Sequence, residues 1–572
     1  MAASADVGEQ DGQGTASVAD GGGTENLQPA ALQDQTATTP RPWGLHFPDI
    51  WINISRGDGS AEVAEKLQEE RKDAVAELAV RYFACTTASS SAGPQHEEPP
   101  VDEEVRLSTE DILVDPLEGG ISNLLYKATN NKGGAAGKNA ESSHANSCTA
   151  HTAVLIRLFG DSKTKKAMSV CERTTENQIC YDLFAKADIG AGVLATFANG
   201  RIERFFTGSR ALEPTEMLVG EISVQIAKKQ AEFHQVAFDV SSRPAKNEAS
   251  TKTTPKSEIW SKLHDWVEKA RHAAASPKAQ NRLDVEELSA ELAFWETWFA
   301  KIDEENNDAA SEQEKEKITT ITPRTSSEKR LSDYNTARRF WSEVVFCHQD
   351  LLGGNVLVDE QNKTASTTTS ADTTNTKEMK INKNSMRLID FEYACWNHRG
   401  HDIANHFNAI PESMLIVANK FDPDEFFPSR EHVKKYVASY LQELFKIKHG
   451  ISKDETAEQA AVENAQPQMD SSSTSAVVEV LTSDSGLDAL LEYCPLAELY
   501  WILWAVILSA TSDVGFDYQN YAEMRWNAGY KKYKKEVLAR RENLLEAAGS
   551  SNSKRPKSTF CAFGGGSCAR AK

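Results

Sequence analysis

The chain lacks the features that mark several protein classes. Its 572 residues carry a formal net charge of −21, with 63 Lys and Arg against 84 Asp and Glu. Binding to nucleic acid through phosphates needs a basic surface, so this balance argues against a nucleic-acid partner. The longest apolar run, residues 496–510, contains Glu498 and is shorter than the roughly 20 residues that span a bilayer. We therefore expect no transmembrane segment.

The cysteines show no disulfide framework. They are nine in number and scattered, and Cys347, Cys395 and Cys494 lie in apolar runs that are typical of reduced, buried thiols. The N-terminus has no charged-then-apolar signal pattern, and the C-terminal residues do not form a prenylation box. These observations predict a soluble, cytoplasmic protein.

Two short stretches carry most of the chemical information. The first reads His348-x-Asp350-x-x-x-x-Asn355, and the second reads Ile389-Asp390-Phe391-Glu392. Phosphoryl transfer needs such a set, with one carboxylate facing the acceptor hydroxyl and an amide plus a second carboxylate holding magnesium. We assign Asp350 to the acceptor, and Asn355 and Asp390 to Mg²⁺. Glu392 should lie on the same side of a strand as Asp390, because side chains alternate with period two.

The flanking residues of these motifs are expected to support the site. His348 should hold its loop by hydrogen bonds, and Arg399 and Asp402 are also predicted to be structural residues. Arg399 and Asp402 lie in a polar segment that follows the second motif, and this segment should begin a helix beside the site.

The pattern of apolar residues divides the chain into a strand-rich part and a helical part. Strands are expected at 109–115, 121–128, 152–159, 192–197 and 201–206. Helices are expected at 61–84, 172–187, 215–237, 258–272, 284–302, 331–340, 430–447, 487–512 and 517–545. This order, together with the motifs, predicts an α+β, protein-kinase-like bilobal fold with a small β-rich N-lobe and a large helical C-lobe.

Polar, low-complexity segments interrupt both lobes, and we expect them to be disordered insertions. One of them, 89–103, lies early in the N-lobe. The predicted organisation is a disordered tail at 1–42, an N-lobe at 43–206 with an insert at 129–150, a C-lobe at 207–546 with inserts at 243–257, 304–329, 359–384 and 452–485, and a disordered tail at 547–572.

The strand-rich part offers candidate nucleotide-binding residues. Gly119 and Gly120 would let the backbone approach phosphate, and Ser122 and Asn123 add hydrogen-bond donors, although a Gly-Gly pair can also be a plain turn. Arg157 places one cation in an apolar strand. It is either an edge-strand side chain facing water or the cation that pairs with nucleotide phosphates. A helical carboxylate, Glu176 or Glu172, should then orient it.

The acceptor side is marked by aromatic residues. Trp501 and Trp504 are spaced i and i+3, so they share one face of a helix, and Phe516, Tyr518 and Tyr521 follow shortly after. This pattern is either an ordinary core stripe or a wall that holds an ammonium group by cation–π attraction.

The chain resembles the choline/ethanolamine kinase family in several stretches. They are GGISNLLYK (119–127), VLIRLFG (154–160), NGRIERF (199–205), VVFCHQDLLGGNVL (344–357), LIDFEYACWNHRGHDIANHF (388–407) and YWILWAVILSATSDVGFDYQNYAEMRW (500–526). The resemblance implies a kinase-like fold and ATP-dependent phosphorylation of an amino-alcohol hydroxyl. It also implies that Asp350 is the catalytic base, that Asn355 and Asp390 hold magnesium, that Arg157 pairs with phosphate, and that Glu392 is important to activity. The implied head-group pocket consists of Tyr393, Trp501, Trp504, Tyr518 and Tyr521.

The chain departs from the family at two positions. The family usually has Glu two residues after Asn-His-Phe, where this chain has Ala409, with Glu412 nearby but out of register. Arg204 lies in the segment that we expect to be the lobe hinge, where it would alter contacts to adenine.

The expected function is ATP- and Mg²⁺-dependent phosphorylation of ethanolamine to phosphoethanolamine, the first step of the CDP-ethanolamine route to phosphatidylethanolamine. The alternatives are a choline or dual choline/ethanolamine kinase and, less favoured, a non-catalytic kinase-like scaffold. The expected partners are ATP and a small amino alcohol, with a second copy of the chain, in a homodimer, as a further candidate.

Overall fold

A six-stranded sheet forms the first part of the structure. The computed structural model describes residues 45–54, 61–90, 107–117, 123–132, 152–159, 173–236, 255–276, 282–312, 325–360, 364–365, 379–380, 385–418, 420–449, 471–512 and 516–549. The strand order is β1-β5-β6-β4-β3-β2, and all neighbours are antiparallel except β1 and β5. The strands are β1 (Leu45–Phe47), β2 (Ile112–Leu117), β3 (Asn123–Asn130), β4 (Ala153–Phe159), β5 (Val193–Phe197) and β6 (Gly200–Arg204).

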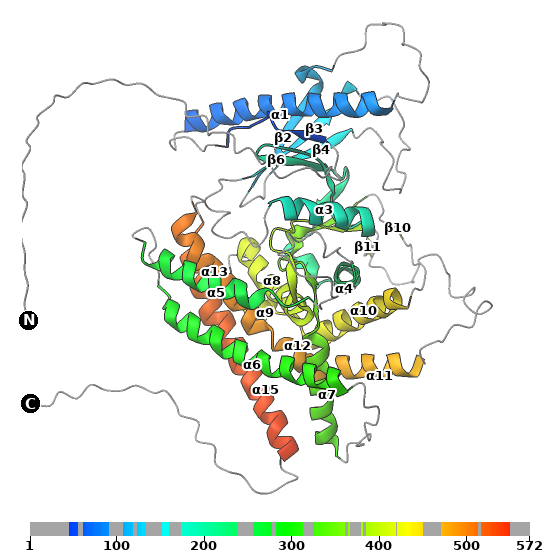
Figure 1. Ribbon diagram of the computed structural model, residues 1–572, viewed down its shortest axis with the longest axis vertical. Coiled ribbons are helices and arrows are strands. Elements are labelled where there is room, and N and C mark those ends of the chain that lie inside the picture. The colour runs from blue at the N-terminus through cyan, green and yellow to red at the C-terminus, as the bar shows by residue number, and fades with distance from the viewer. Residues whose placement is uncertain are drawn as a thin grey trace, which may run out of the picture. The chain divides into compact units, whose positions relative to one another are not determined.

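One long helix covers this sheet. Helix α1 (Ala61–Ser90) lies along β2 and β3, as Figure 1 shows in blue. Its buried residues, such as Val75, Leu78 and Tyr82, share one apolar cluster with Ile156 of β4 and Ile202 of β6. The sheet therefore has a core of its own, because α1 supplies the apolar surface that its strands need on one face.

Helices dominate the rest of the chain. They are α3 (Arg173–Ala187), α4 (Gly220–His234), α5 (Ile259–Ala274), α6 (Val285–Glu312), α7 (Ser326–Trp341), α8 (Arg399–Ala418), α9 (Pro423–Phe426), α10 (Arg430–Lys448), α11 (Ser471–Thr482), α12 (Asp484–Leu491), α13 (Cys494–Thr511), α14 (Tyr518–Met524) and α15 (Lys531–Gly549). A π-helical turn, Arg525–Tyr530, joins α14 to α15, and short 3₁₀ turns lie at Thr109–Asp111, Pro214–Leu218 and Gly353–Asn355. The mixed α+β fold, with its sheet first and its helices after, is as the sequence predicts.

Three small sheets lie within the helical part. One has the order β12-β9-β7, with β7 (Ser209–Ala211), β9 (Val356–Asp359) and β12 (Met386–Leu388). A second pairs β8 (Val344–Cys347) with β13 (Cys395–His398), and a third pairs β10 (Thr364–Ala365) with β11 (Met379–Lys380). Both predicted motifs begin at the ends of these strands, so the strands set where the motif residues lie.

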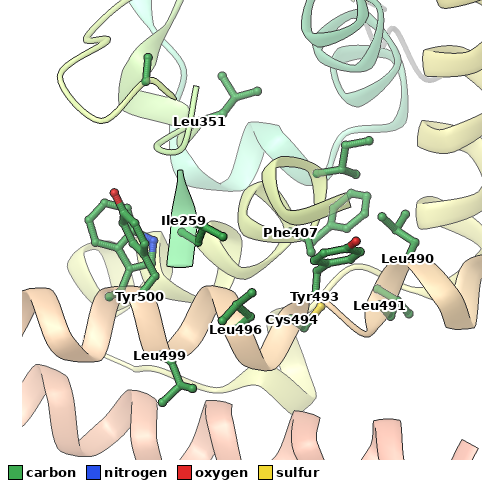
Figure 2. Close-up of a cluster of buried hydrophobic side chains, with 14 of the residues drawn as sticks. Ile259, Leu351, Phe407, Leu490, Leu491, Tyr493, Cys494, Leu496, Leu499 and Tyr500 are labelled. Atoms are coloured by element: carbon green, nitrogen blue, oxygen red, sulfur yellow. The ribbon is translucent and has the colours of Figure 1, made fainter. Parts of the chain in front are cut away.

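Helix α13 runs through the larger core. Its residues Leu496, Leu499 and Tyr500 are buried in one apolar cluster with Ile259 of α5 and Phe407 of α8. Figure 2 shows Tyr500 on the side of α13 that faces Ile259, and Leu499 on the opposite side. The α12–α13 stretch, Asp484–Thr511, is long and apolar enough by composition to cross a membrane. However, 83% of its most apolar window is buried inside the protein, as in a core helix.

Several element boundaries differ from those expected. The range 487–512 is not one helix, because Pro495 opens a new helix at its first turn and so separates α13 from α12. The range 517–545 is interrupted by the π-helical turn. Helix α11 lies inside the range 452–485 that composition assigned to an insert, and α6 continues into the range 304–329. The predicted tail at 1–42 lies outside the described residues.

Gly200 provides a test of the packing between β5 and β6. A Cβ atom there would overlap the Phe197 ring and the Arg157 carbonyl oxygen, whereas one at Gly220 would meet nothing within 4 Å. Gly200→Ala should therefore lower the free energy of unfolding by about 2–3 kcal/mol, because the overlap forces strands apart. Gly220→Ala, at the start of α4, should raise it by up to about 1 kcal/mol. Denaturant titration measures both, and equal stability of the two variants would contradict the packing.

Candidate active site

The three residues assigned to phosphoryl transfer lie together. Asn355 directly precedes β9 and Asp390 follows β12, and the Ile389 amide donates a hydrogen bond of 3.0 Å to the Asn355 carbonyl. The Asn355 side-chain amide donates to Asp350 Oδ2 at 3.0 Å and to the Asp350 carbonyl at 2.8 Å. Pairing of β9 with β12 thus brings the second motif beside the first, across 34 intervening residues between Asn355 and Asp390.

Negative charge is concentrated around Asp350. Burial raises the pKa of Asp350 well above its usual value, and the charges of Glu412, Asp390 and Glu392 raise it further. The hydrogen bond from Asn355 lowers the pKa of Asp350. A bound cation would stabilise the ionised forms of these neighbouring carboxylates.

Two residues of the site have left-handed backbone conformations. Gln349 and Asp390 both have φ of 66°, which is uncommon for residues other than glycine and costs free energy that the surroundings must supply. The conformation of Asp390 also corrects one expectation. Because β12 ends at Leu388 and the chain then turns, Glu392 does not share a strand face with Asp390. Glu392 is half-buried, and its charge still acts on Asp350.

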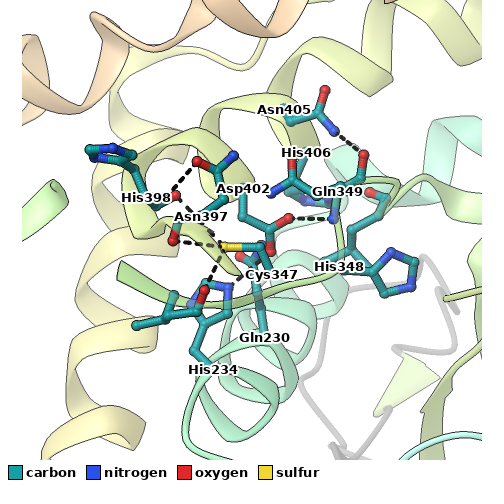
Figure 3. Close-up of polar contacts among 12 residues, drawn as sticks. Gln230, His234, Cys347, His348, Gln349, Asn397, His398, Asp402, Asn405 and His406 are labelled. Carbon is teal, nitrogen blue, oxygen red and sulfur yellow. Dashed lines mark hydrogen bonds and ion pairs between the residues drawn. The ribbon is translucent and has the colours of Figure 1, made fainter. Parts of the chain in front are cut away.

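Helix α8 holds the backbone on both sides of Asp350, and Figure 3 shows its contacts with the preceding residue, Gln349. Asp402 Oδ1 accepts the Gln349 amide at 2.7 Å, and the Asn405 side chain donates to the Gln349 carbonyl at 2.6 Å. His406 Nδ1 donates to the Leu351 carbonyl at 2.7 Å. Both sides of Asp350 are therefore tied to one helix, which is the structural role that the sequence predicts for Asp402.

His348 ties the same loop to the second motif. Its Nε2 lies 3.0 Å from the Ile389 carbonyl, and its Nδ1 accepts the Asp350 amide at 3.3 Å. Burial lowers the pKa of His348, so the ring is neutral at physiological pH and acts through hydrogen bonds.

Asp402 is embedded in a satisfied polar cluster. Its Oδ2 receives Gln230 Nε2 and His234 Nε2, each at 2.9 Å, and His234 Nδ1 lies 2.7 Å from the Tyr440 hydroxyl. Burial would raise the pKa of Asp402, but the hydrogen bond from His234 and its charge hold that pKa below the usual range. Cys347 could join His234 and Asp402 around a metal ion, since their ligand atoms lie within 4.8 Å of one another. Burial raises the pKa of Cys347 well above its usual value, and its thiol faces backbone carbonyls, so we assign the cluster to loop support.

Arg157 is a buried strand cation that reaches the second motif. Strand β4 lies between β3 and β6, and Arg157 is only 4% exposed, which excludes an edge-strand side chain facing water. Its Nη1 lies 3.6 Å from Asp390 Oδ1, and its Nε donates to Glu203 Oε1 at 2.8 Å. Burial alone would lower the pKa of Arg157, but the charges of Glu203 and Asp390 raise it. The guanidinium thus stays charged beside the motif.

The carboxylate that contacts Arg157 through a hydrogen bond differs from the expected one. Glu203 Oε1 accepts hydrogen bonds from Arg157 Nε and, at 2.6 Å, from Arg201 Nε. Glu176 Oε1 instead lies 2.8 Å from Arg201 Nη1. Glu176 still contributes its charge to the pKa of Arg157. Burial would raise the pKa of Glu203, but the two arginines lower it to about 2. In the sequence, the alternation of Arg201 and Glu203 with apolar Ile202 between them could have indicated this cluster.

Other predicted nucleotide-side residues are only partly described. Asn123 opens β3 and is buried. Gly119, Gly120, Ser122 and the alternative carboxylate Glu172 lie outside the described residues.

The predicted aromatic residues gather in one cluster. Trp504 Nε1 donates to the Tyr393 hydroxyl at 2.8 Å, and Trp501 Nε1 donates to Asn405 Oδ1 at 2.8 Å. The Trp504 ring lies 5.5 Å from that of Tyr518 and 6.0 Å from that of Tyr521, measured between centroids. Trp501 and Trp504 also belong to the core, so the core stripe and the aromatic wall are the same feature.

Glu412 completes this cluster and was missed as a site residue. It lies on α8 three residues after Ala409, and positions three apart share a helix face. The Tyr521 hydroxyl donates to Glu412 Oε1 at 2.5 Å, and Arg525 Nη1 lies 2.6 Å from Glu412 Oε2. Its side chain is 20% exposed. A carboxylate one turn further along α8 therefore lies beside the aromatic rings and acts on Asp350.

Comparison with known proteins shows the family of this chain. The family model "Choline/ethanolamine kinase" matches residues 114–530. The chain belongs to the choline/ethanolamine kinase family. Its members are small-molecule phosphotransferases that use ATP, and the matched range includes the residues of both motifs and the aromatic cluster.

Individual relatives are distant. The chain is 25% identical to a probable ethanolamine kinase of Arabidopsis thaliana over 422 residues, which cover 74% of this chain and 79% of the relative. It is 22% identical to choline kinase alpha of Mus musculus over 445 residues, which cover 75% and 77% of the two chains. Among solved structures it is similar to a choline kinase from Cryptosporidium parvum, with 19% identity, a TM-score of 0.46 and coverage of 78% and 93%.

The support of the Asp350 loop by Asp402 can be tested directly. Asp402→Asn should lower the free energy of unfolding by about 2–4 kcal/mol, because the new amide presents donors to Gln230 and His234 in a buried site. The turnover number should fall as well, since the loop loses part of its support. Asp484→Asn, whose side chain is 79% exposed, should change the stability by less than about 1 kcal/mol. Stability and turnover of Asp402→Asn equal to those of the control would contradict the assignment.

Proposed function

We propose that this kinase transfers the terminal phosphoryl group of ATP to the hydroxyl of ethanolamine, forming phosphoethanolamine as the first step of the CDP-ethanolamine route. The observation that carries the proposal is the convergence of Asp350, in the loop after β8, with Asn355 and Asp390, at the ends of the paired strands β9 and β12. The charge of Glu412 in the aromatic cluster also acts on Asp350. Such a site offers one set of groups to the ATP phosphates and the acceptor hydroxyl, and another set to the ammonium group of the acceptor.

Asp350 is suited to receive the hydroxyl proton. Its Oδ2 is held by the Asn355 amide, which fixes the carboxylate while leaving its other oxygen to face the acceptor. The raised pKa of Asp350 makes it a stronger base than an ordinary aspartate. A substrate ammonium nearby would favour the ionised form, so the proton acceptor becomes available when the amine is bound.

The donor atoms fit a magnesium ion. Asp390 Oδ1 is buried, has no hydrogen-bond partner among the described residues, and has Arg157 as its ionic neighbour at 3.6 Å. Asp390 and Asn355 supply the oxygen ligands that Mg²⁺ prefers, and Mg²⁺ would neutralise charge on the ATP phosphates. Arg157 adds a fixed cation for the same phosphates.

The acceptor side suits a small cationic alcohol. The rings of Trp504, Tyr518 and Tyr521 can attract an ammonium group, and Glu412 supplies opposite charge. Ethanolamine carries three N–H donors, and the hydroxyls of Tyr393 and Tyr521, together with Glu412, offer oxygen acceptors. Choline is the second candidate, because the aromatic rings would also hold its methylated head group.

The substrate preference is tested by steady-state kinetics. Purified protein with ATP and Mg²⁺ should phosphorylate both amines, with the higher kcat/KM for ethanolamine. Asp350→Asn should lower kcat by about 10²- to 10⁴-fold, because the proton acceptor is lost. Glu431→Gln, an exposed residue of α10, is the matched control and should leave kcat unchanged. A higher kcat/KM for choline would reverse the preference, and absence of transfer to either amine would support a non-catalytic scaffold.

The role of Glu412 is tested through the amine KM. Glu412→Gln keeps the size of the side chain and removes its charge, so KM for ethanolamine should rise about tenfold while KM for ATP stays within about twofold. The same measurement on Glu431→Gln controls for loss of one negative charge elsewhere. An unchanged amine KM would show that the ammonium group binds away from Glu412.

A further inference from the structure

Glu498 is an ionisable residue in the most apolar helix of the chain. It lies on α13 among residues such as Leu496, Leu499 and Ile502, and it is 0% exposed. An ionised carboxylate is costly to bury unless a partner compensates it. The proposed reaction uses neither its charge nor its position, so its presence needs another explanation.

The partner of Glu498 also holds the proposed amine-binding carboxylate. Arg525 Nε lies 2.8 Å from Glu498 Oε2, and Arg525 Nη1 lies 2.6 Å from Glu412 Oε2. Arg525 Nη1 also donates to the Tyr521 hydroxyl at 2.6 Å. One guanidinium therefore joins a fully buried carboxylate on one side to Glu412 and Tyr521 on the other.

The backbone around Arg525 is built to make this contact. Arg525 opens the π-helical turn Arg525–Tyr530, and a Cβ atom at Gly529 would lie 2.8 Å from Glu498 Oε2. Glycine at this position thus leaves room for the carboxylate. Wide turns of this kind are rare in helices and occur often at functional sites.

The charge of the cluster depends on the state of Glu498. With both carboxylates ionised, Glu412, Glu498 and Arg525 sum to one negative charge, which attracts an ammonium group. With Glu498 protonated, Arg525 cancels the charge of Glu412 and the sum is zero. A group that does not touch the substrate can therefore set the attraction for it.

We propose that Glu498 is a positioning residue that, through Arg525, orients Glu412 and sets the net charge presented to the substrate ammonium. This inference rests on the proposed function, because it assigns the cluster to the amine site. It adds that a buried residue, which does not touch the substrate, sets the affinity for the amine.

The pKa of Glu498 lies near physiological pH. Burial raises the pKa of Glu498 to about 7, against the lowering effect of Arg525, and Glu412 raises it slightly further. The other titratable groups that feel its charge are Tyr521 of α14, Tyr533 of α15 and Cys494 of α13, and burial raises the pKa of all three, which keeps them neutral near pH 7. Glu498 becomes protonated as the pH falls below about 7, so amine affinity should be high above this pH and decrease below it.

Calorimetric titration with choline, in the presence of ADP and Mg²⁺, tests the inference without relying on turnover. Choline is chosen because its own charge does not change with pH. The wild-type Kd should rise about tenfold from pH 8 to pH 6, by loss of one charge near the cation. Glu498→Gln should bind weakly at both values, whereas Glu498→Asp, which keeps a titrating group, should retain a pH dependence. Glu431→Gln should follow the wild type.

The outcomes separate this inference from the proposed function. If Glu498→Gln keeps the wild-type affinity and pH dependence, the inference is wrong while the kinase function stands. A variant with a lower Tm and lower kcat but an unchanged pH profile would show a purely structural role and also overturn it. Where Glu498→Gln does not fold, a wild-type Kd that is the same at both pH values overturns the inference. A wild type that binds and phosphorylates neither amine overturns both proposals.

Discussion

The hydrogen bonds from helix α8 to the Asp350 loop are the interaction on which the site depends. Asp402 and Asn405 fix the backbone of Gln349, whose left-handed conformation would otherwise relax. The same helix carries Glu412 about three turns further on. One helix therefore holds both the Asp350 loop, to which we assign the acceptor hydroxyl, and Glu412, which we propose faces the amine. Helix geometry thus sets the distance between the Asp350 loop and Glu412, and in the proposed reaction this would favour a single productive alignment of the substrate.

Charge is distributed unevenly between the two sides of the site. On the sheet side, Arg157 and Arg201 neutralise Glu203 and Glu176 in a buried cluster, and the Arg157 guanidinium also lies 3.6 Å from Asp390. On the helical side, the charges of Glu412, Asp390 and Glu392 all act on Asp350. A metal–nucleotide complex and an ammonium group would bring positive charge to these carboxylates. Binding of substrates would therefore relieve repulsion that folding alone leaves in place, a common arrangement where a protein is selected for function rather than for maximal stability.

The motif residues could be predicted from the sequence because their geometry is local. Asp350 and Asn355 are separated by one short loop, and the aromatic pair Trp501 and Trp504 by one helical turn, so spacing alone relates them. The pairing of Arg157 with Glu203 depends on which strands are neighbours, and the sheet order β5-β6-β4 is not written in any one segment. The place of Glu412 beside the aromatic rings depends on how α8 packs against α14. The left-handed turn at Asp390 is why the alternation of side chains along a strand did not place Glu392 correctly. The cytoplasmic location, the homodimer and the exact lobe boundaries remain predictions.

The pairing of β10 with β11 has a consequence for how this protein can change over time. This short ladder, Thr364 with Lys380 and Ala365 with Met379, lies in the chain between Asn355 and Asp390. It pairs two segments of the long connection between β9 and β12, the strands that align the two motifs. Residues gained or lost beyond the ladder would leave that alignment unchanged. We therefore expect this connection to tolerate changes in chain length, so that a reporter domain could be inserted between the two strands while the β9–β12 pairing stays intact.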